Sequence, residues 1–384
     1  MTRVWLSAAD ASGDACAAEL CLALRRRRPG VRFLGLGGEQ MEKAGVELVV
    51  HQRELAIGGL VELLPSAPRA WRAWRRLGAA LEAARPGLAV LVDASGLNLP
   101  LARRLQRRGV ASLYYVPPQL WAWRRGRIRR LARRVDRVAA IWPFEVALYR
   151  EAGVRADFVG HPLVDRLRLA PGRREARARL GLPEAGRVVA LLPGSRRNEL
   201  HYNLGLFLDT ARCLHASDPR LRFALPVPAS LDGAAVDRQI ARAGLPASLG
   251  LDRYDGRSIE VLAACDAALA KPGSVTLEAA LLGRPLVVAA RTHPVTAFLL
   301  RRLVEVDWLA MPNLICGEAV VPELLQGDAR PERIARALLE RLEGPQAELQ
   351  LERFAGLAGR LGSGGAAERA AEIAAEMLGE VGKA

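Results

Sequence analysis

The segment RVVALLPGSRRNEL, residues 187–200, decides the fold. Arg187–Leu192 is an apolar run typical of a β-strand, and it ends in the turn Pro193-Gly194-Ser195-Arg196. A helix-like segment follows directly. A strand, a tight glycine turn and a helix form the repeating unit of a parallel α/β sheet. A new α/β unit is therefore predicted to begin near residue 185.

The same alternation occurs on both sides of this segment, with a polar, helix-like connector at 166–182. Continuous apolar runs are typical of strands buried on both faces. The predicted strands are Val4–Ala9, Val31–Leu36, Leu88–Val92, Ala111–Val116, Arg137–Trp142 and Ala156–Val159, then Arg222–Pro226, Ala267–Ala270 and Leu286–Ala290. We expect an α/β protein with two doubly wound, Rossmann-like domains, 1–165 and 166–350. A C-terminal helix at about 366–384 should pack back on the first domain. Ligands of such sheets bind beyond the carboxyl ends of the strands, here in an interdomain cleft.

Composition supports two cores and an anionic partner. The chain has 384 residues, 51% of them apolar, and 56 Lys and Arg against 41 Asp and Glu give a net charge of +15. Nucleic acid, anionic lipid or a phosphorylated substrate would suit that charge, although a GC-rich genome would account for part of the arginine excess. No uncharged apolar run is long enough to span a bilayer, and Asp10 and Asp14 come too early for a signal peptide. We therefore expect a cytoplasmic protein.

Two motifs of the first domain follow predicted strands. Asp10 precedes Ser12-Gly13-Asp14, where a helix start could present free N–H groups to an anion or a sugar hydroxyl. Asp93 ends the apolar run 88–92 and precedes Asn98; burial there would favour a general base. The alternative for both motifs is ordinary helix capping.

Tryptophans beside arginines form a third kind of motif. Trp121-Ala122-Trp123-Arg124 leads into a basic run that continues to Arg137, and Arg69–Arg76 contains Trp71 and Trp74. Aromatic rings at headgroup depth with arginines on phosphates predict a membrane-interface element. A solvated basic helix or a nucleic-acid-binding surface are the alternatives.

The second domain offers two glycine turns for a nucleotide diphosphate. The first contains Gly194, Ser195 and Arg196 followed by Glu199, and the second contains Gly273 and Ser274 followed by Thr276 and Glu278. Glycine permits close backbone approach, arginine forks onto a diphosphate, and a glutamate one turn into a helix could accept ribose hydroxyls. The amides of Asn313 and Gln326 are weaker candidates. There is no Walker A loop and no Asp-x-Asp, so neither a metal nor a cofactor is expected.

Taken in order, these motifs resemble the lipid-A-disaccharide synthase family. The series is S-G-D, V-D-A-x-x-x-N, P-x-x-W-A-W-R, P-F-E, G-H-P, L-P-G-S-R-x-x-E, G-[ST]-x-T-L-E, P-N-[IL] and P-E-L-L-Q, over about residues 3–340. Three places depart from the family pattern. Ala9-Asp10 replaces Gly-Glu, and Gly96-Leu97 replaces Asp-Phe. Pro272-Gly273-Ser274, with Lys271 before it, stands where Ser-Gly-Thr is usual.

The resemblance implies a GT-B fold and an inverting transfer from UDP-2,3-diacylglucosamine to 2,3-diacylglucosamine 1-phosphate, which would give the β-1,6 disaccharide 1-phosphate and UDP. Asp93 is the preferred base, with His161 (by resemblance) and Asp10 as alternatives. Acceptor contacts are expected from Ser12, Gly13, Asp14, Asn98, Trp121, Trp123 and Arg124. The chain would lie on the inner face of the inner membrane, bind no nucleic acid, and could form a homodimer. Alternative functions are another lipid-directed GT-B transferase, a UDP-sugar 2-epimerase, or a non-enzymatic basic binding protein.

Overall fold

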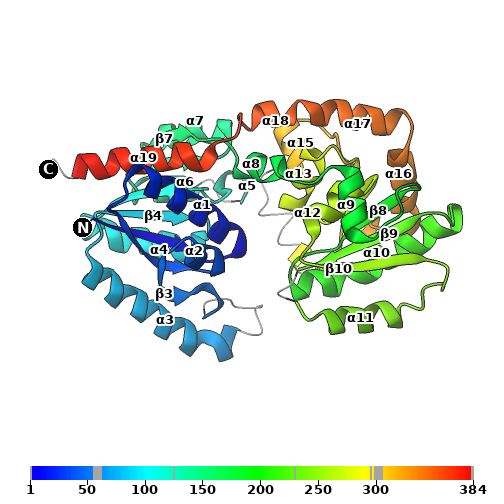
Figure 1. Cartoon of the computed structure of the whole chain (residues 1–384), viewed down its shortest axis with the longest axis horizontal. Helices are drawn as coiled ribbons and strands as arrows, with labels where there is room; N and C mark the ends of the chain where they lie inside the picture. The colour runs from blue at the N-terminus through cyan, green and yellow to red at the C-terminus, as the bar shows by residue number, and fades with distance from the viewer. Residues whose placement is uncertain are drawn as a thin grey trace. The chain divides into compact units, whose positions relative to one another are not determined.

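A computed structural model describes residues 2–54, 63–123, 126–228, 231–294, 296–297 and 306–381. The chain divides into two compact units (Figure 1). Unit 1 consists of residues 1–165 and 361–384, and unit 2 of residues 166–360. In the described ranges, no helix is long and apolar enough to cross a membrane.

The described part of unit 1 contains a seven-stranded parallel sheet in the order β3-β2-β1-β4-β5-β6-β7. Its strands are β1 (Arg3–Ala8), β2 (Arg32–Gly37), β3 (Glu47–His51), β4 (Leu88–Val92), β5 (Ala111–Tyr115), β6 (Arg137–Ala140) and β7 (Arg155–Phe158). All five residues of β4 are buried, because helices cover both faces of the sheet.

Most helices of unit 1 lie between successive parallel strands, whereas α8 and α19 follow the last strand. They are α1 (Ala11–Arg27), α2 (Glu39–Lys43), α3 (Leu63–Ala84), α4 (Ser95–Gln106), α5 (Leu120–Trp123), α6 (Gly126–Ala132), α7 (Pro143–Glu151) and the C-terminal α19 (Ala366–Val381), with α8 (Pro162–Arg168) at the boundary and a 3₁₀ turn at Gln52–Glu54. Helix α19 packs along α1, as predicted for the C-terminal helix (Figure 1).

Helix α19 is tied to unit 1 at its first turn. The Asp165 carboxylate accepts hydrogen bonds from the backbone N–H groups of Gly365 (2.7 Å) and Ala366 (3.0 Å). The Arg369 guanidinium donates to the Val159 carbonyl at 2.6 and 2.9 Å. The two bonds to Asp165 satisfy backbone N–H groups at the helix start, which have no intrahelical partner.

Replacing Asp165 by alanine should therefore loosen α19. Loss of a helix cap lowers the free energy of local unfolding by about 1 to 2 kcal/mol. If the helix opens locally, its hydrogen-exchange rate should rise roughly 5- to 30-fold. Hydrogen exchange measured by mass spectrometry over residues 361–381 tests this. Glu372→Ala, at an exposed position of the same helix, is the control. Equal protection in both variants would contradict the capping role.

The described part of unit 2 contains a six-stranded parallel sheet in the order β10-β9-β8-β11-β12-β13. Its strands are β8 (Val188–Leu192), β9 (Arg222–Val227), β10 (Gly250–Asp255), β11 (Ala267–Ala270), β12 (Leu286–Ala290) and β13 (Glu323–Leu325). Its helices are α9 (Arg173–Leu180), α10 (Arg197–Ser217), α11 (Gly233–Arg242), α12 (Ser258–Ala264), α13 (Ser274–Leu281), α15 (Met311–Cys316), α16 (Pro331–Leu342), α17 (Pro345–Ala355) and α18 (Leu357–Arg360), with a 3₁₀ turn at Gln326–Asp328.

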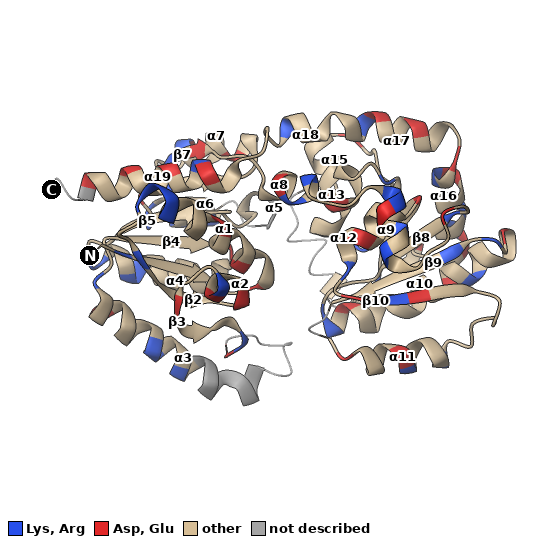
Figure 2. Ribbon diagram, viewed as in Figure 1, with Lys and Arg blue, Asp and Glu red and all other residues tan. Residues whose placement is uncertain are grey.

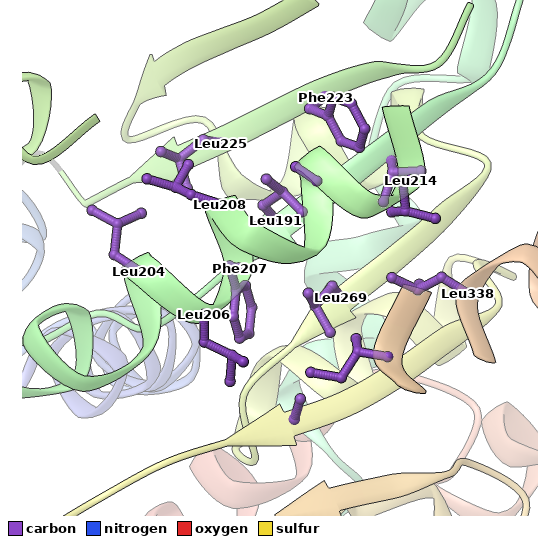
Figure 3. Close-up of a cluster of buried hydrophobic side chains, with 14 of the residues drawn as sticks. Leu191, Leu204, Leu206, Phe207, Leu208, Leu214, Phe223, Leu225, Leu269 and Leu338 are labelled. Atoms are coloured by element: carbon purple, nitrogen blue, oxygen red, sulfur yellow. The ribbon is translucent and has the colours of Figure 1, made fainter. Parts of the chain in front are cut away.

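Both faces of the unit 2 sheet carry a hydrophobic core. On one face, Phe207 of α10 is fully buried with Leu191 of β8 and Leu269 of β11 (Figure 3). On the other face, small residues of β8 and β11 such as Ala190 and Ala268 pack in a second cluster with α12 and α13. The two-domain, doubly wound prediction is thus confirmed. The predicted connector helix 166–182 is instead two helices, α8 and α9, since the chain contains Pro171-Gly172 between them.

Each sheet reverses its winding at one point. In unit 1 this switch lies between β1 and β4, and in unit 2 between β8 and β11. In open α/β sheets, ligands bind beyond the carboxyl ends of the strands at such a switch point. The predicted motifs at Asp10 and Asp93 follow β1 and β4, and those at Gly194 and Gly273 follow β8 and β11.

Candidate functional site

In unit 1, Asp93 directly follows β4 in a turn of unfavourable backbone conformation. Asp93, Ala94 and, in the neighbouring loop, Val116 have φ values of 46°, 43° and 53°. The Asp93 carbonyl accepts hydrogen bonds from the Tyr114 hydroxyl and from the Asn98 amide (3.0 Å). Left-handed backbone costs non-glycine residues of order 1–3 kcal/mol, and such residues cluster at functional sites. The turn is therefore a strong candidate for an active-site element.

Asn98 holds this turn in place. Its side chain is fully buried, and its amide nitrogen also donates to the Val92 carbonyl at 2.9 Å. Its amide oxygen accepts from the Ser7 hydroxyl at 2.7 Å, which joins the ends of β1 and β4. Because both ends of the amide already have protein partners, these contacts favour a positioning role for Asn98 over the substrate contact predicted from sequence.

Asp10 caps helix α1. Its carboxylate accepts the N–H of Gly13 at 2.7 Å, and α1 begins at Ala11. Ser12 is exposed in the first turn of the helix, whereas Gly13 is buried. A Cβ on Gly13 would lie 3.3 Å from an Asp10 oxygen, so a larger residue would crowd the cap. The capping alternative considered for this loop thus applies to Asp10, and the exposed Ser12 is accessible to a ligand.

Asp14 is also a capping residue, but its carboxylate caps α2 and not the helix to which it belongs. It is 2% exposed, and its carboxylate accepts the N–H groups of Gly38 (2.6 Å), Gln40 (2.9 Å) and Met41 (3.2 Å). These groups form the start of α2, whereas Asp14 itself lies in the first turn of α1. Three backbone donors occupy both oxygens of the carboxylate, which favours this structural role over acceptor binding.

His161 is oriented by the backbone that follows it. Its Nδ1 atom accepts the N–H of Leu163 at 3.1 Å, and its ring lies 4.7 Å from the Trp142 ring. In the neutral imidazole the proton must then reside on Nε2, since the Nδ1 lone pair is engaged. A histidine in this form donates through Nε2 instead of accepting a proton. The contact thus favours Asp93 over His161 as the base.

Trp121 belongs to the interior of unit 1. It is 7% exposed, its indole N–H donates to the buried Glu145 carboxyl at 2.9 Å, and its ring lies 4.9 Å from that of Phe144. Burial raises the pKa of Glu145 to about 8, although the Trp121 hydrogen bond acts in the opposite direction. The membrane-surface interpretation of Trp121 is therefore wrong. Arg124 lies outside the described residues, as does the side chain of Trp123.

In unit 2, the turn after β8 depends on Gly194 and Glu199. Gly194 has φ 148°, and a Cβ added there would come 2.4 Å from Cβ of Glu199. The Glu199 carboxylate accepts the Ser195 N–H at 2.8 Å and lies 3.3 Å from the guanidinium of Arg196. The Arg196 side chain is 78% exposed and thus accessible to an anion.

The turn after β11 reaches the same carboxylate. Lys271 follows β11 directly, and its ammonium lies 2.9 Å from Oε1 of Glu199. Burial acts to raise the pKa of Glu199, but the charge of Lys271, with its hydrogen bond and that of Ser195, holds the pKa below its ordinary value. Gly273 also has φ 148°, and exposed Ser274 begins α13. The two glycine turns are thereby joined across the switch point.

Two further residues of α13 differ in accessibility. The buried Thr276 hydroxyl donates to the Gly273 carbonyl at 2.8 Å and accepts the N–H of Met311 at 3.1 Å. These bonds shape the turn, so they favour a structural role for Thr276. Glu278 is half-buried; burial raises its pKa, and the charge of Arg166 opposes that rise.

The two amides of the weaker motif are engaged with the protein. Asn313 is fully buried, and its amide pairs with the N–H (2.7 Å) and carbonyl (2.8 Å) of Val321. In the orientation that satisfies both groups, the Gln326 amide pairs with the backbone of Thr292 at 3.2 and 3.3 Å. These contacts favour structural roles over the base or sugar recognition predicted for both residues.

Solved structures of low sequence identity share this architecture. UDP-GlcNAc 2-epimerase from Neisseria meningitidis, bound to UDP-GlcNAc, aligns with a TM-score of 0.65 at 12% identity, covering 99% of each chain. The glycosyltransferase of kitacinnamycin aligns with a TM-score of 0.64 at 17% identity, covering 98% of this chain and 99% of its own. The predicted GT-B fold class is confirmed.

Relatives of higher sequence identity show to which family within the GT-B fold class the chain belongs. The family model described as Lipid-A-disaccharide synthetase matches residues 4–372. Lipid-A-disaccharide synthase of Geobacter sulfurreducens is 41% identical over 380 residues, 98% of each chain, and that of Myxococcus xanthus is 41% identical over 377 residues, 98% of this chain and 97% of its own. The chain belongs to the lipid-A-disaccharide synthase family and is a glycosyltransferase of this type.

Two residues of these sites were not assigned a role from the sequence. Lys271 only precedes the Pro272-Gly273-Ser274 turn in the sequence, and Glu145 is only the last residue of the P-F-E motif. For Lys271 the available signal was its position directly after an apolar strand and before a glycine turn. For Glu145, an acidic residue beside Pro143 and Phe144 does not by itself indicate full burial.

Proposed function

We propose that the chain transfers 2,3-diacylglucosamine from UDP-2,3-diacylglucosamine to the 6-hydroxyl of 2,3-diacylglucosamine 1-phosphate, with inversion at the anomeric carbon. The products are the β-1,6-linked disaccharide 1-phosphate and UDP. The observation that carries this proposal is the family match over residues 4–372, together with relatives 41% identical over almost the whole chain. A UDP-linked donor also fits the Neisseria meningitidis epimerase structure, which has the same fold and is bound to UDP-GlcNAc.

Unit 2 is proposed to bind the donor nucleotide at its switch point. Arg196 is exposed beside the turn after β8, and α13 begins at the turn after β11. The helix start and the guanidinium would both stabilise the negative charge that develops on the diphosphate as UDP leaves. Ser195, Ser274 and Glu278 remain proposed nucleotide contacts. No metal ion is required in this scheme.

Unit 1 is proposed to supply the base. As the acceptor oxygen O6 forms its bond to the anomeric carbon, its proton passes to the Asp93 carboxylate. The bond from the anomeric carbon to the β-phosphate oxygen breaks, and UDP departs with the electron pair. The turn at Asp93 is fixed by the hydrogen bond from the Asn98 amide to the Asp93 carbonyl. This supports the role, because a base must be fixed within hydrogen-bond reach of the proton that it removes.

The decisive test is UDP release by the purified chain supplied with both acylated substrates. We expect UDP to form in equal amount to the disaccharide 1-phosphate, and neither to form when the acceptor is omitted. Release of UDP at the background rate with both substrates present would refute the proposed reaction.

A second candidate is a UDP-sugar 2-epimerase, favoured only by the shared fold. An epimerase would convert UDP-GlcNAc without any acylated acceptor. Conversion of UDP-GlcNAc to its 2-epimer would support this candidate. The family match favours the transferase over the epimerase. A third candidate, another lipid-directed GT-B transferase, would be recognised by activity with a different acceptor.

Helix α3 is the surface proposed to contact anionic lipid at the inner face of the inner membrane. Trp71 is 59% exposed, and the Arg75 guanidinium lies 4.9 Å from its ring centre. Arg72 and Arg76 are also exposed on this helix, and Figure 2 shows basic residues along its described part. The exposed aromatic ring beside arginines has the chemistry of a membrane-interface helix. Arg137, at the end of the predicted basic run, is instead buried and paired with Asp157 and Glu376.

Removing two of these charges should weaken lipid binding. Each arginine near an anionic surface contributes about 1 kcal/mol, so Arg72→Gln with Arg75→Gln should lower partitioning roughly 30-fold. Co-sedimentation with vesicles containing phosphatidylglycerol, at low and high salt, measures the change. Arg238→Gln with Arg242→Gln, exposed on α11 of unit 2, is the control pair. If partitioning into vesicles changes neither with salt nor with the α3 substitutions, α3 is not the lipid-binding surface.

A further inference from the structure

The ion pair between Lys271 and Glu199 bridges the switch point of unit 2. It joins the turn after β8 to the turn after β11, two neighbouring strands in which Leu192 pairs with Ala270. The side chains are 22% and 19% exposed. Both oxygens of Glu199 are used, one by the Ser195 N–H at 2.8 Å and one by Lys271 at 2.9 Å. The carboxylate thus fixes the position of the ammonium group.

Stability does not explain this pair. A half-buried ion pair gains little, because desolvation of both charges offsets most of their attraction. The ammonium is placed above the second glycine turn, since a Cβ on Gly273 would lie 3.5 Å from Cε and Nζ of Lys271. That turn leads directly into α13, whose first N–H groups lack intrahelical partners. A lysine held over this turn is placed to meet an anion there.

The net charge of the side chains at the two glycine turns, after β8 and after β11, is positive. Lys271 and Arg196 contribute two positive charges against the single negative charge of Glu199, and the pKa of Glu199 is held low, so it is ionised at neutral pH. Arg196 approaches from the β8 turn and Lys271 from the β11 turn. A diphosphate offers two phosphate groups, and the two cations are placed one on each turn.

We propose that Lys271 is a contact residue for the second phosphate of the donor diphosphate, and that Glu199 is a positioning residue for Lys271 instead of a nucleotide contact. This rests on the proposed function. When the bond from the anomeric carbon to the phosphate oxygen breaks, that oxygen keeps the electron pair, and the Lys271 ammonium donates a hydrogen bond to it. No proton needs to be transferred.

Calorimetric titration of the full-length chain with UDP and with UMP tests the proposal. Loss of a charge-assisted contact to the second phosphate should lower the ratio of UDP to UMP affinity about tenfold or more in Lys271→Met. Lys271→Arg, which keeps the charge, should hold the ratio within about threefold of the unaltered chain. The UMP affinity reports whether each variant keeps a folded nucleotide site.

Two further variants separate the contact from the general electrostatic field. Lys271→Met combined with Glu199→Gln leaves the summed charge of the pair at zero, as in the unaltered chain. A tenfold fall in the ratio of UDP to UMP affinity in this double variant therefore identifies the lysine contact. Arg187→Met, at the opposite end of β8, removes an exposed ion-paired cation and should leave the ratio unchanged. An unchanged ratio in both Lys271→Met variants would overturn the inference alone. Failure of the unaltered chain to bind UDP would overturn the proposed function as well.

Discussion

Asp93→Asn is expected to lower the turnover number by at least about a hundredfold while leaving the affinity for UDP unchanged. General-base catalysis contributes about 10²–10⁴-fold, and an amide cannot accept the acceptor's proton. Asparagine is nearly the same size as aspartate and tolerates left-handed backbone, so it suits the φ of 46° at this position. The fold and the turn should therefore persist. Steady-state kinetics with both acylated substrates and UDP calorimetry measure the two quantities.

The matched control for this substitution is Asp10→Asn. Asp10 also follows a strand at the same switch point, but its carboxylate caps α1 through the Gly13 N–H. Asparagine caps helices as well as aspartate does, so turnover should change little. If Asp93→Asn kept near-normal turnover, or if Asp10→Asn lost as much, Asp93 would not be the base.

Arg196→Ala should weaken UDP binding by about 1.5–3 kcal/mol, or roughly 10- to 150-fold, the range for hydrogen bonds to charged groups. Because the Arg196 side chain is 78% exposed and contacts Glu199 at 3.3 Å, its removal should leave the core of unit 2 unaffected. The loss would then report the missing phosphate contact. Calorimetry with UDP gives the change directly.

Arg197→Ala is the control, since Arg197 is an adjacent exposed arginine at the first position of α10. We expect its UDP affinity to stay within a few-fold of the unaltered chain. Activity in EDTA should also be retained, because the proposed site uses Arg196 and a helix start in place of a metal ion. Equal affinities of Arg196→Ala and Arg197→Ala, or complete loss of activity in EDTA, would contradict the proposed nucleotide site.

The central strands could be predicted from the sequence because they are buried on both faces. Leu88–Val92, Ala267–Ala270 and Leu286–Ala290 coincide with β4, β11 and β12. Strands β3, β10 and β13 were missed, and each lies at the edge of its sheet. Edge strands need no continuous apolar run: β10 has the sequence GLDRYD, and none of its residues is fully buried. Hydrophobic pattern alone does not separate such a strand from a loop.

The candidate sites were predictable in position but less so in the role of each side chain. A motif after a parallel strand must lie at the carboxyl edge of the sheet, which placed Asp93 and Gly194 correctly. Whether a polar group there faces a ligand depends on partners distant in sequence. Asp14 bonds to Gly38, 24 residues away, and Lys271 pairs with Glu199, 72 residues away. Such contacts depend on the register of the strands and helices, which no local pattern specifies.

The return of the chain to unit 1 has a consequence for the order of events during synthesis. A ribosome that has released residues 1–360 has delivered all of unit 2, whereas unit 1 still lacks α19. Unit 2 can thus complete its core first, while the surface of α1 that α19 covers stays exposed to water and to chaperones. Unit 1 is synthesised first but can complete its core only after all of unit 2 has been delivered, because α19 follows unit 2 in the chain.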